Sequence, residues 1–290
     1  MANLKHIQSQ IKSVSSIQKV TKAMKMVAAA KLKRAQERME QARPYSKRLE
    51  TVIQDLLASD LDSSISPLLQ ERQNIHKHAI LVITSDRGLA GSFNSNVIKA
   101  VEEQVNVLGK DKVKLICIGK KCFEYFENRS YNVESPFQET WDNLTYTQAI
   151  NIGNYLVKLF LNKEIDSLNV VFNFFKNAAS QEVLNNQILP IKFQDKSKKS
   201  LEDIIFEPSK EEIVTTLVPK YFNTQIWQCL LESFASEQAA RMLAMDNATE
   251  NAKEMISDLK LQFNKARQTA ITTEMLEIVG GAEALKLTKG

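Results

Sequence analysis

The stretch from Lys220 to Val279 contains no glycine or proline, and as one helix its roughly 60 residues would be about 90 Å long. A domain of ordinary size has no interior space for such a helix. Charged residues interrupt the stretch throughout, so it does not predict a membrane span. The sequence predicts one long helix that needs a partner, with Pro219 near its start as a first-turn residue or a kink and its end at Gly280-Gly281. Apolar residues at three- and four-residue spacing form its stripe: Phe222, Ile226, Leu230, Phe234, Met242, Met245, Ala248, Ala252, Met255, Leu259, Phe263, Ala266, Ala270 and Leu276.

A second stripe with helical spacing near the N-terminus supplies that partner. Because a compact centre joins the two stripes, antiparallel packing is the simplest geometry, and Pro44 predicts a kink at Arg43. Many alanines and methionines favour close, irregular packing over a regular leucine zipper. The stripe comprises Leu4, Ile7, Ile11, Val14, Ile17, Val20, Met24, Val27, Ala35, Met39, Ala42, Leu49, Val52 and Leu56.

Positive charge is concentrated in residues 1–50, although the formal net charge of the chain is only +4. The pattern indicates an acidic partner, which can be nucleic acid, anionic lipid or an acidic protein surface, or else a solvated helix face. Only Glu37, Glu40 and Glu50 oppose the basic residues there, which are Lys5, Lys12, Lys19, Lys22, Lys25, Lys31, Lys33, Arg34, Arg38, Arg43, Lys47 and Arg48.

The middle of the chain alternates strand-like and helix-like patterns, which predicts an open, Rossmann-like α/β sheet with crossover connections. We therefore expect three parts: a coiled-coil helix at 1–59, an α/β domain at 60–208, whose segment Lys192–Ser209 is a surface excursion, and a second coiled-coil helix at 209–290. The expected strands are Ala79–Thr84, Val113–Ile118 and Leu168–Phe175, and the expected helices run from Val97 to Leu108 with Gly109 as the end, from Lys120 to Asn128 and from Thr145 to Leu161.

The loop after the first predicted strand contains two glycines, Gly88 and Gly91, ahead of a helix. A strand, a glycine-bearing turn and a helix can bind phosphate, but this spacing matches neither the dinucleotide fingerprint nor the P-loop. A second interpretation is a tight turn with Ser92 or Asn94 as the helix cap. A third is a docking loop comprising Asp86, Arg87, Gly88 and Gly91, in which Asp86 and Arg87 bond to a neighbouring subunit.

No arrangement of residues predicts catalysis or a metal site. Cys117, Cys122 and Cys229 are too few and badly spaced for a disulfide framework or a zinc site, and we expect reduced thiols. His6, His76 and His78 lie near no metal-ligand pattern. The N-terminus lacks an apolar signal core, so we expect a chain that stays inside the cell. These patterns favour a mechanical or interaction protein that needs no cofactor.

Three segments resemble the gamma subunit family of F-type ATP synthases. The N-terminal motif is Ile11–Val14 with Ile17–Ala29, and the central motif is Ile83–Asn94. The matches follow the family's order over almost the whole chain, so the set is specific although each motif alone is not. The C-terminal motifs are Ser236–Met242, Ala244–Thr249, Asn264–Gln268, Ile271-Thr272 and Glu277–Ala282.

The resemblance implies a rotor shaft, one copy per complex, whose terminal helices form an antiparallel, left-handed coiled coil inside a ring of three alpha and three beta subunits. Its α/β domain would lie beside the epsilon subunit and the membrane c-ring. Proton flow would turn the shaft, and ATP would be made on beta, so this chain would have no chemistry of its own. It would be a peripheral protein on the cytoplasmic face of the bacterial inner membrane, with no lipid insertion.

The resemblance also implies contact residues. Lys19, Lys22, Met24 and Lys25 correspond to positions near the acidic lever loop of beta, although some family members have an acidic residue where this chain has Lys25. Arg267 and Gln268 match positions that bond the catch loop of beta.

Two other functions compete with this interpretation. A basic coiled coil could bind nucleic acid, but Tyr45 is the only aromatic residue of the first arm, which argues against base stacking. A nucleotide-binding enzyme built on the Gly88 loop is the other.

Overall fold

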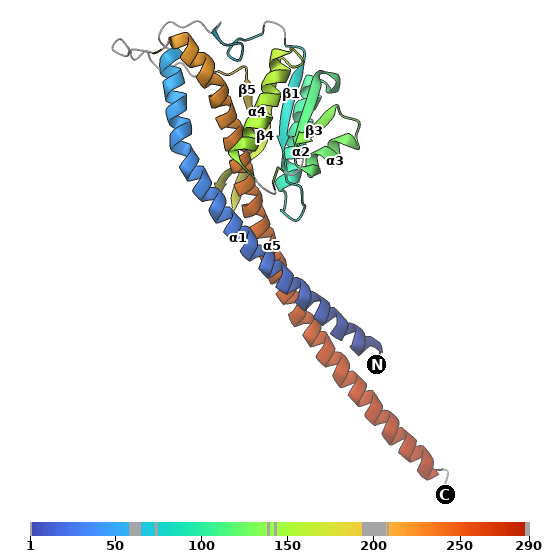
Figure 1. Cartoon of the computed structure of the whole chain (residues 1–290). Coiled ribbons are helices and arrows are strands. Elements are labelled where there is room, and N and C mark those ends of the chain that lie inside the picture. Colours follow the sequence, from blue (N-terminus) through green and yellow to red (C-terminus); the bar gives the residue numbers. More distant parts are fainter. Residues whose placement is uncertain are drawn as a thin grey trace. The chain divides into compact units, whose positions relative to one another are not determined.

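The computed structural model describes residues 2–57, 65–72, 75–137, 140–141, 144–192, 207 and 209–287 (Figure 1). It divides into two compact units, which we call the coil unit (Met1–Val27 with Ala244–Gly290) and the α/β unit (Ala28–Leu243). Two long helices, α1 (Ala2–Leu57) and α5 (Lys210–Leu287), each contribute to both units. The predicted pair of long terminal helices with a central α/β sheet is therefore confirmed.

The described residues of the α/β unit form a five-stranded sheet in the order β3-β2-β1-β4-β5. Its strands are parallel except β5, which pairs antiparallel with β4. The strands are β1 (His78–Ile83), β2 (Val113–Ile118), β3 (Val133–Phe137), β4 (Ser167–Asn177) and β5 (Ser180–Leu189). The helices between them are α2 (Phe93–Leu108), the 3-10 helix η2 (Lys110–Lys112), α3 (Lys120–Glu127) and α4 (Tyr146–Leu161).

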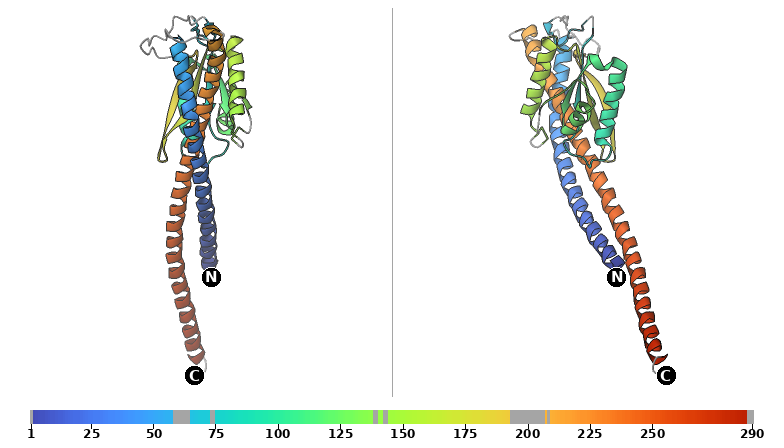
Figure 2. Two further views of the ribbon diagram at one scale, coloured as in Figure 1. Left: turned by 60° about the vertical axis from the view of Figure 1, so that its left-hand side comes forward. Right: turned by 90° about the vertical axis from the view of Figure 1, so that its right-hand side faces the viewer.

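Both faces of the sheet are covered, which explains the continuous apolar run of β1. Leu81 and Ile83 pack in a cluster with residues of α4, α5 and α1, whereas Ile80 and Val82 pack with residues of α2 and α3. Figure 2 shows the helices on either side of the sheet. All four side chains are fully buried.

Two strands were missing from the sequence prediction, and both lie at the edges of the sheet. Few side chains of β3 and β5 are fully buried, and β5 has the polar sequence SQEVLNNQIL. An edge strand pairs on one side only and can be solvated, so it needs no apolar run to form. The predicted strands and short helices were correct to within a few residues at their ends.

The predicted end of the last helix at Gly280-Gly281 was wrong, because α5 continues through both glycines to Leu287. Glycine ends a helix when it adopts a left-handed conformation, and both residues keep helical backbone instead. The helix begins at Lys210, close to the predicted start at 209, and Pro219 therefore lies inside it, as Pro44 lies inside α1.

In the coil unit α1 and α5 run antiparallel, and α5 extends past the start of α1 (Figures 1 and 2). Residues that are buried or half-buried recur at alternating spacings of three and four, the seven-residue period of a left-handed coiled coil. On α1 they include Ile7, Ile11, Val14, Gln18, Thr21 and Lys25, and on α5 they include Met245, Thr249, Ala252, Ile256, Leu259, Phe263, Ala266 and Ala270.

The inner stripe therefore differs from the predicted one. Ile17, Val20 and Val27 were assigned to it but are 54–57% exposed, and Met255 and Leu276 of α5 are also exposed. The true inner stripe includes polar residues, which a search for apolar residues alone passes over.

Helices α4 and α5 approach closely where Gly153 faces Asn223. A Cβ atom added to Gly153 would lie 1.9 Å from Oδ1 of Asn223, an atom that is buried and has no hydrogen-bond partner among the described residues. We expect Gly153→Ala to lower the free energy of unfolding by about 1–3 kcal/mol through overpacking, measured by urea denaturation.

The matched control is Gly280→Ala, also within a helix, where an added Cβ atom meets nothing within 4 Å. This change should leave stability unchanged or raise it by up to about 1 kcal/mol. Adding Asn223→Ala to Gly153→Ala should recover part of the loss. If Gly153→Ala and Gly280→Ala changed the free energy of unfolding equally, the close approach of α4 and α5 would be contradicted.

Candidate interaction surfaces

A polar layer lies within the coil unit. The hydroxyls of Thr21 and Thr249 are 2.8 Å apart, and Nζ of Lys25 donates to Oδ1 of Asp246 at 2.5 Å. Thr21 and Lys25 occupy inner positions of the seven-residue repeat, where polar residues fix register and orientation at a cost in stability. Register is thus specified by matched polar groups rather than by apolar packing alone.

The residues predicted to contact beta lie on two separate parts of the coil unit. Lys19 and Lys22 are exposed on α1, and Arg267 and Gln268 are exposed on α5. Met24 and Lys25 are half-buried. The ammonium group of Lys25 binds Asp246 of the same chain, a partner that the sequence does not predict.

A second, outer apolar stripe follows α1 in the coil unit. Ile17, Val20, Met24 and Val27 are spaced by three and four residues, and all but Met24 are more than half exposed. Such spacing places them on one side of the helix. The spacing of these residues is visible in the sequence, where it suits the inner stripe equally well. An apolar strip outside the coil is suited to contact with another protein.

The loop between β1 and α2 is held by contacts within the α/β unit. Oδ1 of Asp86 accepts a hydrogen bond from the Lys120 amide at 2.9 Å, and the Gly88 carbonyl accepts one from Arg241 at 2.7 Å. Two of the predicted docking residues are therefore used within the chain. Arg87 remains exposed, as does Leu89, which adopts a left-handed φ of 64°.

The prediction that Ser92 or Asn94 caps α2 holds for position, because Ser92 is the N-cap residue. Ser92 makes no side-chain cap hydrogen bond, and Oδ1 of Asn94 accepts the amide of Ser85 at 3.0 Å. Gly91, which has φ 56°, provides the backbone reversal. The Asn94 side chain therefore closes the loop on itself rather than starting the helix.

Helix α5 lies against the carboxyl ends of β1 and β4, the region where open α/β sheets bind nucleotides. Oγ of Ser236 donates to the Asn173 carbonyl at 3.1 Å. Arg241 bonds the loop after β1 and forms an ion pair of 2.6 Å with Glu237, whose side chain is 8% exposed. Burial raises the pKa of Glu237, and Arg241 opposes that shift. These contacts argue against the nucleotide-binding interpretation.

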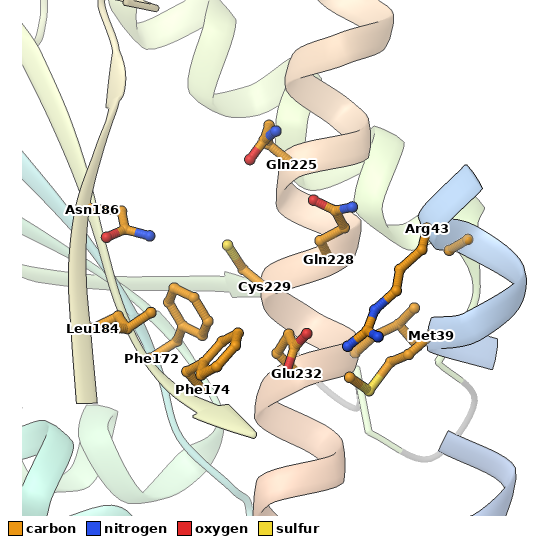
Figure 3. A pocket seen from close by; sticks show the side chains of 12 residues that line it. Met39, Arg43, Phe172, Phe174, Leu184, Asn186, Gln225, Gln228, Cys229 and Glu232 are labelled. Atoms are coloured by element: carbon orange, nitrogen blue, oxygen red, sulfur yellow. The ribbon is translucent and has the colours of Figure 1, made fainter. Parts of the chain in front are cut away.

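A pocket of about 220 Å³ opens between β4, β5, α5 and α1 (Figure 3). Phe172, Phe174 and Leu184 line its strand side, opposite Cys229 and Glu232 of α5. Burial raises the pKa of the Cys229 thiol to about 12, so the thiol is neutral near pH 7 and a poor nucleophile. Burial also raises the pKa of Glu232, which accepts the amide of Phe175. The pocket offers contact surface rather than a set of reacting groups.

All three cysteines are buried and free. Within the described ranges, no three His, Cys, Asp or Glu side chains gather as metal ligands would. None of the helices in the described part of the chain has an apolar stretch suited to crossing a bilayer.

The fold and its surfaces define a class of protein: one that has an antiparallel coil of its two terminal helices, with apolar and basic residues exposed along it, and a small α/β sheet. The model of a family described as ATP synthase matches residues 3–285. The ATP synthase gamma chain of Cytophaga hutchinsonii is 47% identical over 294 residues, covering 98% of this chain and 99% of that protein. The gamma chain of Prosthecochloris aestuarii is 45% identical over 293 residues, covering 99% and 100%.

Solved structures agree in fold. A chain of the Euglena gracilis mitochondrial ATP synthase, in a structure of OSCP, F1 and the c-ring, superposes with a TM-score of 0.69 at 18% identity, covering 100% of this chain and 96% of that one. A central stalk chain of the Tetrahymena thermophila enzyme gives 0.57 at 24% identity, covering 79% and 99%. The chain belongs to the family of ATP synthase gamma chains, the rotor subunits of the central stalk.

The buried Arg241–Glu237 pair provides a test of the loop anchor. We expect Arg241→Ala to lower the free energy of unfolding by about 3–5 kcal/mol, because it leaves a buried carboxylate without its partner. Lys253→Ala, which removes an exposed pair with Glu250 on the same helix, should change stability by less than about 0.5 kcal/mol. Similar losses in both variants, measured by urea denaturation, would argue against a buried anchor.

The Lys25–Asp246 pair should be weak, because its side chains are 40% and 43% exposed. A double-mutant cycle with Lys25→Ala and Asp246→Ala should give a coupling of about 0.2–1 kcal/mol that shrinks at high salt. The exchange Lys25→Asp with Asp246→Lys should restore most of the stability that either single reversal removes. A coupling of zero at low salt would show that the two charges do not interact.

Proposed function

We propose that this chain transmits torque between the c-ring and a ring of three alpha and three beta subunits, and that it catalyses no reaction itself. Rotation of a shaft can change the nucleotide affinity of a beta site only if the shaft makes different contacts at different angles. The coil unit supports this role because its sides are unequal. One side of α1 carries the outer apolar stripe, whereas exposed polar residues cover others.

The observation that carries the proposal is the exposed end of α5. Residues 271–282 are all exposed, although Ile271, Met275, Leu276, Ile278 and Val279 are apolar. α5 extends past the start of α1 there, so α1 does not cover these residues (Figure 2). An apolar helix end of this kind is suited to burial in a protein partner, and the centre of a subunit ring would supply it.

We assign contact with beta to Lys19, Lys22, Met24 and Lys25 on α1 and to Arg267 and Gln268 on α5. Exposure of Lys19, Lys22, Arg267 and Gln268 supports the assignment. The ammonium group of Lys25 is already paired with Asp246, so this carboxylate partly neutralises its charge.

The docking loop keeps its proposed role with a changed set of residues. Arg87 and Leu89 would meet the neighbouring subunit, while Asp86 and Gly88 hold the loop in place and Gly91 allows its turn. In this proposal the coil helices at 1–59 and 209–290 form the shaft and the α/β domain at 60–208 forms the foot, although residues 28–57 and 210–243 of the two helices belong to the α/β unit.

The foot would contact the epsilon subunit and the c-ring. Each complex would contain one copy of this chain. We place the protein at the cytoplasmic face of a bacterial inner membrane, held there by other subunits. Bacterial relatives such as those from Cytophaga and Prosthecochloris support this location.

The test is reconstitution with alpha and beta subunits of a homologous synthase. We expect one copy to join a six-subunit ring and to stimulate ATP hydrolysis. Arg267→Ala and Gln268→Ala should each lower that stimulation roughly fivefold, the effect of losing about 1 kcal/mol at an interface residue.

Lys260→Ala, an exposed lysine of the same helix, is the matched control and should leave stimulation unchanged. The mass of each assembly shows whether a variant fails to join the ring or joins and fails to stimulate. A folded chain that neither assembles nor changes turnover would refute the rotor function.

A further inference from the structure

The pocket between β4, β5, α5 and α1 is large enough for one aromatic ring. Its volume of about 220 Å³ exceeds the roughly 150 Å³ at which an apolar cavity in a protein can bind benzene. Phe172, Phe174 and Leu184 form an apolar wall on the strand side, and Cys229 of α5 faces them (Figure 3). A flat apolar ring fits such a wall, because it can pack against the phenyl groups by its face or its edge.

Polar side chains that lack partners line other parts of the pocket. Among the described residues, the side-chain amides of Gln228 and Asn186 form no hydrogen bond, and Arg43 forms no direct ion pair. Each of the two amides can both donate and accept a hydrogen bond. A ligand that carries a hydroxyl or a carboxamide group would therefore find a donor and an acceptor beside the apolar wall.

The charges on the lining of the pocket offset each other. Arg43 and Glu232 are the charged residues among those that line it, one of each sign. Burial raises the pKa of Glu232, whereas the amide of Phe175 and the charge of Arg43 oppose that shift. Neither sign is in excess, so an ionised ligand would lose hydration without gaining an unpaired counter-ion. The lining therefore favours an uncharged ligand.

We propose that this pocket binds a small uncharged aromatic molecule that carries one hydroxyl or carboxamide group. The ring would lie against Phe172, Phe174 and Leu184. The polar group would bond the amides of Gln228 and Asn186. Apolar walls with a few placed polar groups are the usual composition of small-molecule sites.

Such a ligand would also stabilise the α/β unit. The lining comes from α1, from α5 and from the β4–β5 pair, so a bound molecule would contact both terminal helices and the edge of the sheet at once. A ligand that binds only the folded chain raises its stability in proportion to the logarithm of the ligand concentration. This proposal goes beyond the rotor function and does not rest on it.

The first experiment measures binding to the free full-length chain by saturation-transfer NMR, with benzamide and phenol as probes. Benzamide should bind with a Kd of about 1 mM, a value within the limits for a fragment of this size. Benzoate and benzylamine, which carry a negative and a positive charge, should bind at least roughly fivefold more weakly. Absence of binding by both uncharged probes would refute the proposal, as would equally tight binding of either charged one.

The second experiment fills the pocket. Benzamide at about ten times its Kd should raise Tm by about 2–5 °C. Leu184→Phe places a ring of the chain's own in the pocket, so it should weaken binding at least roughly fivefold and remove most of this rise. The matched control is Gln187→Phe, an exposed residue of the same strand that lies outside the pocket, and it should preserve both effects.

Circular dichroism of each variant verifies that it is folded. Equal loss of benzamide binding in Leu184→Phe and Gln187→Phe would count against this pocket as the site.

The Cys229 thiol tests the location of the ligand without any substitution. Methyl methanethiosulfonate labels thiols, and mass spectrometry of peptides identifies which cysteine has reacted. Because burial raises the pKa of Cys229 to about 12, labelling is carried out in alkaline buffer. Saturating benzamide should slow the labelling of Cys229 at least roughly threefold, since the thiol lines the pocket. The reactivity of Cys117 and Cys122, which lie outside the pocket, should not change.

Benzamide that binds without protecting Cys229 would occupy another site. That result would overturn the proposal even if Leu184→Phe failed to fold. None of these outcomes depends on whether the chain acts as a rotor, so the two hypotheses fail by different observations.

Discussion

The structure depends on one constraint: a very long helix needs a partner that covers its apolar stripe. The 78 residues of α5 cannot bury an apolar stripe against themselves, and an isolated helix gains little stability from propensity alone. Within the coil unit α1 supplies the partner, and within the α/β unit both helices join the cluster that includes Leu81 and Ile83 of β1. One helix pair thus provides both the shaft and part of the core of the sheet domain.

The coil departs from a regular zipper through its polar layer. Apolar residues at Thr21 and Lys25 would bury more surface, but apolar stripes alone would also permit the helices to slide by one repeat. Matched hydroxyls and a matched ion pair disfavour such slippage, because any shift leaves these groups opposite the wrong neighbours. A shaft that transmits torque needs a defined register more than it needs maximal stability.

Most of the architecture could be predicted from the sequence, because long helices and buried parallel strands leave strong periodic patterns. The edge strands β3 and β5 could not, since solvated strands leave no such pattern. Continuation of α5 through Gly280-Gly281 was also missed, because glycine permits a helix end without requiring one. Among the candidate contact residues, exposure of Lys19 or Arg267 follows from the helical pattern, whereas the pairing of Lys25 with Asp246 depends on a register that only the structure gives.

The Lys25–Asp246 ion pair also bears on how sequences in this family can vary. An ion pair between two facing helix positions is nearly symmetric, so the acidic and the basic residue can exchange places with little change in the contact. A change of sign at only one of the two positions would instead place like charges opposite each other. Family members with an acidic residue at the position of Lys25 should therefore carry a basic residue at the position of Asp246, and the two sites should evolve as a pair.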